Sequence, residues 1–138
     1  MLAERAITRV LHRYAQGVDR YRLEQLRSCY WDEAHDSHLP HFSGPVDEYV
    51  QWLAEVLPPL ASTSHQLTNI LIDVDLRSGR AAVESYCLNT LVTRPEGDAP
   101  HTRTLQCLRY LDGFERRADE WRILERRVER DWSWLIPV

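Results

Sequence analysis

The stretch LPPLASTSHQLTNILIDVD, residues 57–75, decides the fold, because the periodicity of the chain changes within it. Before this stretch, apolar residues recur every three to four positions, as they do on one face of an α-helix. The pair Pro58-Pro59 ends that pattern, since proline cannot continue a helix. After it, turn sequences separate runs that read as strands over 65–76, 81–93, 102–116 and 121–131. Helices followed by an antiparallel meander predict an α+β fold with the helices packed against one face of a curved sheet.

Helices are expected upstream of this change, where the apolar residues form stripes. Their predicted ranges are 3–17, 21–30 and 45–57. In the first range, Ile7, Leu11 and Tyr14 follow the spacing of a buried stripe, so the tyrosine hydroxyl points towards the interior. Residues 31–43 are predicted to form a loop or a short strand. A chain of 138 residues, 43% of them apolar, is expected to form a single domain over residues 1–138.

Side chains in the predicted strands should alternate between the two faces of the sheet. On the first strand this alternation groups His65, Leu67, Asn69 and Leu71 on one face. On the second strand it groups Val83, Ser85, Cys87 and Asn89. Neither group is uniformly apolar, which suits a sheet face that lines a pocket of mixed polarity and also suits an interface between subunits.

The charge and cysteine content exclude several classes of function. The formal net charge is −4, so no basic surplus is available to neutralise nucleic-acid phosphates. All 17 cationic residues are arginine, which excludes a Schiff-base lysine and a phosphate-binding-loop lysine. The three cysteines show no metal-binding spacing, and no segment resembles a signal peptide or a membrane span. We expect a soluble, cytoplasmic protein that binds neither nucleic acid nor membranes.

Asp19 and His65 lie where one predicted hydrophobic element ends and another begins. A carboxylate that binds one imidazole nitrogen leaves the other free to accept a proton, which produces a general base. Each residue also has a simpler explanation. Asp19 is typical of a turn, His65 of a strand start bonded to nearby backbone, and Tyr14 of a core position with a satisfied hydroxyl. If Asp19 and His65 meet in the fold, an enzyme is expected.

The segment Asp32–His41 contains three histidines and three acidic residues, a composition compatible with zinc or iron binding. Its spacing matches no known ligand motif, so a hydrated loop is the preferred interpretation and no metal ligand is predicted. The pairs Arg116-Arg117 and Arg126-Arg127 are interpreted as solvated charges at strand edges, with an inward-facing Arg116 as the exception.

The whole chain resembles the SnoaL-like branch of the nuclear transport factor 2-like superfamily. The resemblance is sharpest in three segments, which are the run from Ala6 through Gly17-Val18-Asp19 to Tyr30-Trp31-Asp32-Glu33-Ala34, the strand Ser64-His65-Gln66-Leu67-Thr68-Asn69, and the hairpin 114–122. The resemblance implies a cone-shaped α+β barrel, with N-terminal helices packed in the concave face of a curved, mostly antiparallel sheet. It also implies an Asp19–His65 dyad like that of lindane dehydrochlorinase, with Arg116 in the place of that enzyme's catalytic arginine.

The resemblance also indicates which leaving group the substrate loses. The catalytic lysine of lindane dehydrochlorinase corresponds to Tyr14, and a phenol cannot stabilise a leaving chloride as an ammonium does. Tyrosine at this place resembles the bile-acid dehydratases, and scytalone dehydratase also combines an Asp–His pair with tyrosines. A further acidic residue of the bile-acid enzymes corresponds to Asn89. The resemblance therefore favours loss of water over loss of chloride.

The sequence thus predicts a cofactor-independent lyase, preferably a dehydratase, acting on a hydrophobic cyclic or aromatic small molecule. In this hypothesis His65 takes a proton from carbon and Asp19 orients its ring. Tyr14 donates to the departing oxygen, and Arg116 stabilises developing negative charge. The predicted substrate-binding residues are Asn89, Tyr30, Trp31, Trp52 and Tyr86.

Other readings stay open beside this one. An isomerase or a cyclase could use the same base, and a non-catalytic binding protein or subunit could share the fold. A homodimer or homotrimer is expected, and the apolar tail Trp132–Val138 needs burial in a neighbour or over the pocket mouth.

Overall fold

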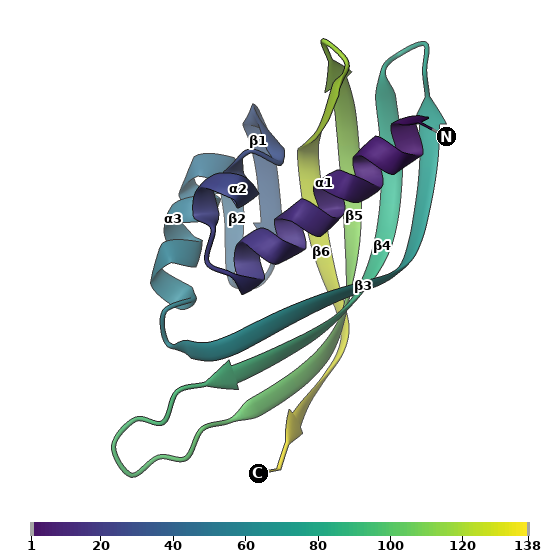
Figure 1. Cartoon of the computed structure of the whole chain (residues 1–138). Coiled ribbons are helices and arrows are strands. Elements are labelled where there is room, and N and C mark those ends of the chain that lie inside the picture. The colour runs from purple at the N-terminus through teal and green to yellow at the C-terminus, as the bar shows by residue number, and fades with distance from the viewer. Residues whose placement is uncertain (1, 138) are drawn as a thin grey trace.

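The computed structural model describes residues 2–137 and has the predicted α+β architecture (Figure 1). Helices and strands follow one another in the expected order. Their bounds are α1 Leu2–Asp19, α2 Leu23–Arg27, β1 Tyr30–His38, β2 Phe42–Pro45, α3 Val46–Val56, β3 Leu60–Asp75, β4 Arg80–Thr93, β5 Arg103–Arg117 and β6 Glu120–Ile136. No helix in the described range is long and apolar enough to cross a membrane.

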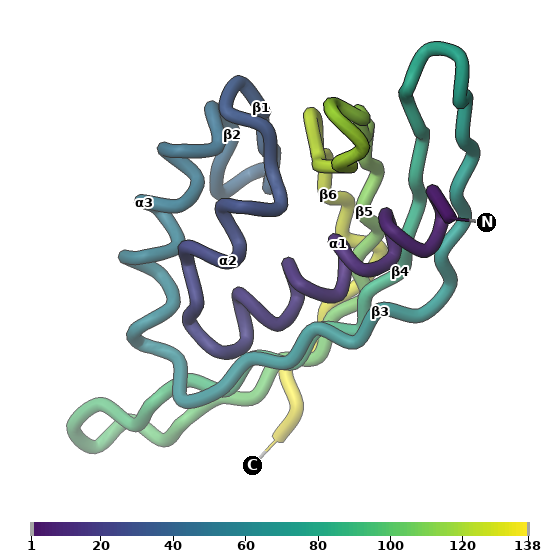
Figure 2. Tube along the Cα trace, turned by 45° about the horizontal axis from the view of Figure 1, so that its top comes forward, coloured from purple at the N-terminus to yellow at the C-terminus, as the bar shows by residue number. Residues whose placement is uncertain are grey.

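The strands form one strongly curved sheet in the order β2-β1-β6-β5-β4-β3. Neighbouring strands are antiparallel except β1 and β6, which run parallel. α1 crosses the concave side of the sheet, and α2 and α3 lie beside β1 and β2 (Figures 1 and 2). Within residues 2–137 the edge strands β2 and β3 do not pair with each other, so the cone is open and not a closed barrel.

α1 is fixed on the sheet by the apolar stripe that its sequence predicts. The buried members of this stripe, each at most 5% exposed, are Ile7, Leu11, Tyr14 and Val18. Burying one large apolar side chain contributes about 1.5–3 kcal/mol, so the stripe is enough to hold the helix. Gly17 does not end the helix, which continues to Asp19. A Cβ on Gly17 would lie 2.9 Å from the Cβ of Leu26, so glycine permits the close approach of α1 and α2.

The segment predicted as a loop or short strand over 31–43 is the hairpin of β1 and β2. α2 is shorter than predicted, and α3 begins at Val46, directly after Pro45. The long strands extend beyond their predicted ends. β6 runs through most of the apolar tail, where Trp132 pairs with Cys107 of β5. The tail is thus held by the sheet ladder, while Trp134 stays 65% exposed.

β3 carries a bulge that reverses the alternation predicted for it. Between Leu67 and Ile70, three steps along β3 correspond to two along β4, so β3 has one extra residue. Ile70 therefore packs on the core together with Leu67, whereas Asn69 and Leu71 are exposed. The predicted sharing of one face is correct for His65 and Leu67 and wrong for Asn69 and Leu71. On β4 the predicted group stays together, because Val83, Ser85, Cys87 and Asn89 are all buried.

Candidate active site

The C-terminal end of α1 meets β3 through Asp19 and His65, which are 46 residues apart in the sequence. One carboxylate oxygen of Asp19, Oδ1, lies 2.7 Å from Nδ1 of the His65 ring. The other, Oδ2, accepts a hydrogen bond from the main-chain N–H of His65 at 2.9 Å. A carboxylate at a helix C-terminus opposes the helix dipole, and these two contacts offset that cost. The predicted meeting of the two residues is present.

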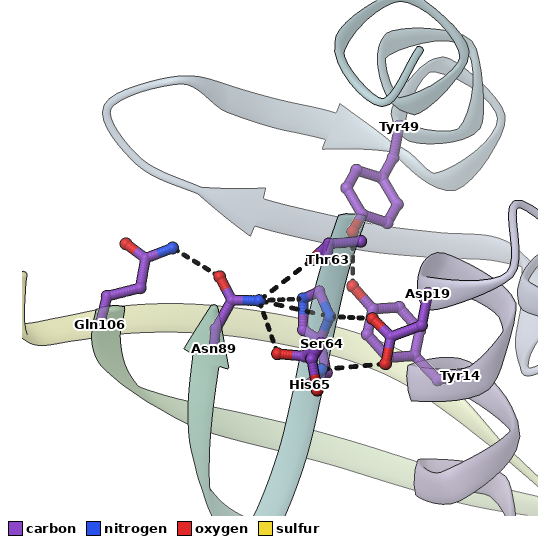
Figure 3. A network of polar contacts seen from close by, with 8 residues as sticks. All are labelled: Tyr14, Asp19, Tyr49, Thr63, Ser64, His65, Asn89 and Gln106. Atoms are coloured by element: carbon purple, nitrogen blue, oxygen red, sulfur yellow. Dashed lines mark hydrogen bonds and ion pairs between the residues drawn. The ribbon is translucent and has the colours of Figure 1, made fainter. Parts of the chain in front are cut away.

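The two contacts of Asp19 determine which nitrogen of the His65 ring carries the proton. Because Asp19 accepts from Nδ1–H, the neutral ring keeps its acceptor lone pair on Nε2. The side-chain nitrogen of Asn89 lies 3.2 Å from Nε2 and 3.4 Å from Nδ1 (Figure 3). An amide in line with the Nε2 lone pair would be much farther from Nδ1, so Asn89 lies over the ring face. The lone pair of Nε2 is left available for a proton.

Asn89 is itself oriented by its neighbours on adjacent strands. Its amide nitrogen donates to the Ser64 carbonyl at 3.2 Å and to Thr63 Oγ1 at 3.3 Å, and its oxygen accepts from Gln106 Nε2 at 2.7 Å. These partners fix which end of the amide carries nitrogen. Asn89 is 1% exposed, so it packs beside the His65 ring with no freedom to turn away.

His65 and Asn89 line a cavity of about 340 Å³ between the helices and the concave face of the sheet. This volume lies within the range of small-molecule sites. Most of the wall surface is apolar, although nine of the seventeen lining residues carry polar groups. The apolar wall residues are Val18, Trp52, Leu53, Val56, Leu57, Leu60, Leu91 and Leu108. The polar ones are Tyr14, His38, His41, Tyr49, Thr63, His65, Asn89, Gln106 and Tyr110. Asp19 lies behind His65.

Tyr14 comes from α1 and reaches the cavity beside the dyad. Its hydroxyl forms a short hydrogen bond with the hydroxyl of Tyr49 from α3 (Figure 3). Burial raises the pKa of Tyr14, and nearby Arg126 only partly opposes this effect. Burial likewise raises the pKa of Tyr49. Both phenols therefore stay protonated at neutral pH. One hydroxyl proton forms the bond between the two tyrosines, and the other can be donated to a molecule in the cavity.

Four of the predicted site residues lie elsewhere. Arg116 is exposed at the far end of β5, with its guanidinium 6.0 Å from the ring of Trp121. Trp31 is held outside the cavity between the guanidinium groups of two arginines. Tyr86 is on the opposite face of the sheet and is 38% exposed. Tyr30 is fully buried behind the wall. The structure brings together Tyr14, Asp19, His65, Asn89 and Trp52, and not these four.

A buried arginine that sequence reasoning took for a solvated charge lies beneath the cavity. Arg126 makes two bonds of 2.7 Å to Asp112, and both side chains are 0% exposed. Its guanidinium carbon lies 4.1 Å from the ring centroid of Tyr14 and 4.3 Å from that of Tyr110. Burial alone would lower the pKa of Arg126, but Asp112 and nearby tyrosines more than reverse this, so it stays cationic. One feature of the sequence could have indicated this buried pair, namely Asp112, an acidic residue inside an apolar strand.

The histidine-rich segment contributes to the cavity in a way that sequence reasoning missed. His38 and His41 line the wall, and His38 is bonded to the buried carboxylate of Asp36. His35, on the same strand, is exposed. Within residues 2–137, no three His, Cys, Asp or Glu side chains come together in a group that could hold a metal ion.

A curved, open sheet with helices in its hollow and a polar-lined cavity between them defines a nuclear transport factor 2-like fold. The sequence places the chain within one branch of that class. It belongs to the SnoaL-like domain family, whose model matches residues 1–127. No curated protein matches the sequence.

Solved structures of similar proteins share this fold. A hexachlorocyclohexane dehydrochlorinase (LinA, type 2) is 22% identical, with a TM-score of 0.85 over 99% of this chain and 90% of that one. The LinA type 3 protein of Novosphingobium barchaimii LL02 is 19% identical, with a TM-score of 0.84 over 98% and 91%. A proposed scytalone dehydratase from Novosphingobium aromaticivorans DSM 12444 is 23% identical, with a TM-score of 0.83 over 99% and 89%. At these identities the likeness establishes the fold alone.

Proposed function

We propose that the protein is a cofactor-independent lyase that eliminates water from a hydrophobic cyclic alcohol bearing a carbonyl group. The observation that carries the proposal is the Asp19–His65 pair, in which Nδ1 is held by the carboxylate and Nε2 is left with a free lone pair beside an apolar cavity. A general base of this kind contributes about 10²–10⁴-fold to proton transfer from carbon. The carboxylate also stabilises the imidazolium that forms.

The rest of the wall supports the loss of an oxygen leaving group. Tyr14 and Tyr49 supply protonated hydroxyls, and such donors suit an oxygen that gains negative charge as its bond to carbon breaks. The chain has no lysine to stabilise a departing chloride. Arg126 lies under the ring of Tyr14 and adds positive potential below the hydroxyl pair. The chemistry therefore favours water over halide.

The cavity also limits the substrate. About 340 Å³ accepts a molecule of one or two rings, and the apolar wall from α3, with Trp52 and Leu53, favours a ring over a charged chain. Gln106 gives one amide N–H to Asn89 and keeps a second, which can orient a carbonyl. We therefore place the substrate among cyclic or benzo-fused β-hydroxy ketones.

The test is a panel of cyclic and benzo-fused β-hydroxy ketones, with the enone product followed by absorbance and identified by mass spectrometry. Wild-type protein should dehydrate at least one member. His65→Gln should lower kcat by about 10²–10⁴-fold with the fold intact. Asp19→Asn should also be severely impaired, because the amide favours the wrong tautomer of His65.

The control is His12→Gln, because His12 is exposed on α1 and far from the chemistry. This variant should match wild type in turnover. Turnover by His65→Gln at the wild-type rate would contradict the assignment of the base. If the product were an isomerised ketone with no loss of water, His65 would remain the base and the reaction would be an isomerisation instead of an elimination. Binding without any turnover would favour a binding protein of the same fold.

A further inference from the structure

A second Asp–His pair enters the same cavity from β1. Asp36 is 0% exposed, and its Oδ2 accepts a hydrogen bond from the hydroxyl of Tyr30 at 2.6 Å. Its Oδ1 is bonded to Nδ1 of His38. With both oxygens engaged, the carboxylate is fixed, and it holds the proton of a neutral His38 ring on Nδ1. This arrangement repeats that of Asp19 and His65, with residues from a different element of the fold.

The His38 ring belongs to the cavity wall and not to the core. It lines the cavity together with His65, and its side chain is 18% exposed. The ring is stacked on Tyr49, with centroids 5.0 Å apart and planes 15° apart. Among the described residues, Nε2 of His38 has no hydrogen-bond partner, so its second nitrogen is left for a bound molecule.

The hydroxyl pair of Tyr14 and Tyr49 connects the surroundings of the two histidines. Tyr14 lies beside Asp19 and His65 in the close view of the site, and its hydroxyl meets that of Tyr49 (Figure 3). Tyr49 in turn stacks on His38. A ring-sized molecule in a cavity of about 340 Å³ can therefore contact both imidazoles at once.

We propose that His38, held by Asp36, is the general acid of the reaction, and this proposal rests on the lyase function proposed above. In the step, Nε2 of His65 takes the proton from the carbon next to the carbonyl. The C–H electron pair forms the new C=C bond, and the C–O bond breaks with its electrons passing to oxygen. That oxygen takes the proton from Nε2 of a protonated His38 and leaves as water. His65 ends the step protonated and His38 neutral, and one proton passing from the first to the second restores the starting state.

This assignment defines the substrate more narrowly than the base alone does. Hydroxide is a poor leaving group and needs a proton as it departs, whereas acetate or a phenolate leaves without one. A site with a dedicated acid at one wall and a base at the other is suited to the hydroxyl substrate. The bound ketone should lie with its acidic C–H towards His65 and its β-hydroxyl towards His38.

The closing experiment compares two substrates that share one carbon acid and one product. They are the best β-hydroxy ketone of the panel and its acetate ester, both of which give the same enone. His38→Gln should lower kcat on the hydroxyl substrate by about 100-fold and on the ester by less than about threefold. His65→Gln should lower kcat on both substrates by about 10²–10⁴-fold. His35→Gln is the matched control, because His35 lies on the same strand and is exposed.

The outcomes separate the two proposals. Equal losses on hydroxyl and ester in His38→Gln would overturn the acid role of His38 and leave the base at His65 standing. Turnover of neither compound by wild-type protein would overturn the lyase function and the acid role with it. Loss on the hydroxyl substrate alone would support both.

A measurement on the wild-type protein keeps the proposal testable if His38→Gln fails to fold. Long-range proton–nitrogen NMR on protein labelled with nitrogen-15 in histidine reports the tautomer of each ring. His38 should carry its proton on Nδ1 and leave Nε2 free in the neutral form, and Asp36→Asn should change this preference. A neutral His38 ring protonated on Nε2 would overturn the proposal.

Discussion

Two carboxylate–nitrogen pairs on opposite sides of the cavity wall invite comparison: Asp19 with His65, whose ring lines the cavity, and Asp112 with Arg126 beneath it. Asp19 binds His65 at 2.7 Å, and the two side chains are 17% and 10% exposed. Asp112 binds Arg126 twice at 2.7 Å, and both side chains are 0% exposed. The bonds have the same length, but only His65 has a nitrogen in reach of a bound molecule. Bond length does not distinguish a chemical pair from a supporting pair, whereas burial and access to the second nitrogen do.

The two pairs should respond to mutation in opposite ways. Removing a member of a pair that is fully buried leaves an uncompensated charge, which costs folding free energy. Removing a member of a pair at the cavity wall leaves water able to enter, and the loss falls on the reaction. The following variants test that contrast, from the largest expected effect to the smallest.

Asp112→Ala should lower the free energy of unfolding by about 3–5 kcal/mol, because Arg126 is left buried without its counter-charge. Urea denaturation followed by circular dichroism measures this loss. The double variant Asp112→Leu with Arg126→Met should recover most of the stability, since it removes both charges together. Asp19→Ala should cost much less stability than Asp112→Ala. Equal destabilisation by the two alanine variants would contradict the comparison.

Folding stability at alkaline pH should show whether water reaches the region beneath the cavity. Burial raises the pKa of Cys87 from its ordinary 9.0 to about 11. Between these values the unfolded chain releases the thiol proton and the folded chain keeps it, so stability falls as pH rises from about 9 to 11. The loss from this thiol is about 3 kcal/mol at most, and Cys87→Ala should make the decline with pH shallower.

Cys107→Ala is the control for this experiment, because Cys107 is not fully buried. It should leave the slope of stability against pH unchanged between about pH 9 and 11. Buried tyrosines with raised pKa values act in the same direction from about pH 10 upwards, so the contribution of Cys87 is read as the difference between wild type and Cys87→Ala. These tyrosines are Tyr14, Tyr30, Tyr49 and Tyr110. A slope that Cys87→Ala does not change would show that water reaches the thiol.

Arg116→Gln should have the smallest effect of the three. The side chain is exposed and lies away from the cavity, so stability should change by less than about 0.5 kcal/mol. Turnover on the ketone panel should stay within about twofold of wild type, whereas Arg126→Gln should be severely destabilised. A large loss of turnover in Arg116→Gln would restore the role that the resemblance gave it.

The order of elements and the position of the dyad could be predicted because local patterns determine them. The stripe through Ile7, Leu11 and Tyr14 placed α1, and the proline pair at the end of α3 marked the change to strands. Asp19 and His65 each end or begin such an element, so their meeting follows from the packing of α1 on β3.

The remainder depended on features that no local pattern carries. Tyr86 is the exception, because alternation along β4 already places it on the face opposite Asn89, so only one of the two could line the cavity. Arg116 is in phase with the buried Phe114 but lies beyond the part of the sheet that the helices cover, so it is exposed. A register shift in the β5–β6 pairing precedes Arg126 and turns it inward, against the simple alternation of its strand.

The double contact of Asp19 has a consequence for how such a protein can diversify. One carboxylate oxygen binds the main chain of β3 and the other binds the ring of His65, so α1 and β3 fasten the base to the scaffold, with Asn89 of β4 packed on the ring. The surfaces that a substrate meets on the other sides come from α3, β4, β5 and the β1–β2 hairpin. Residues there that contact neither histidine can be exchanged for others without moving the base. A protein of this architecture can therefore keep the Asp19–His65 base while its cavity wall changes to accept a new substrate.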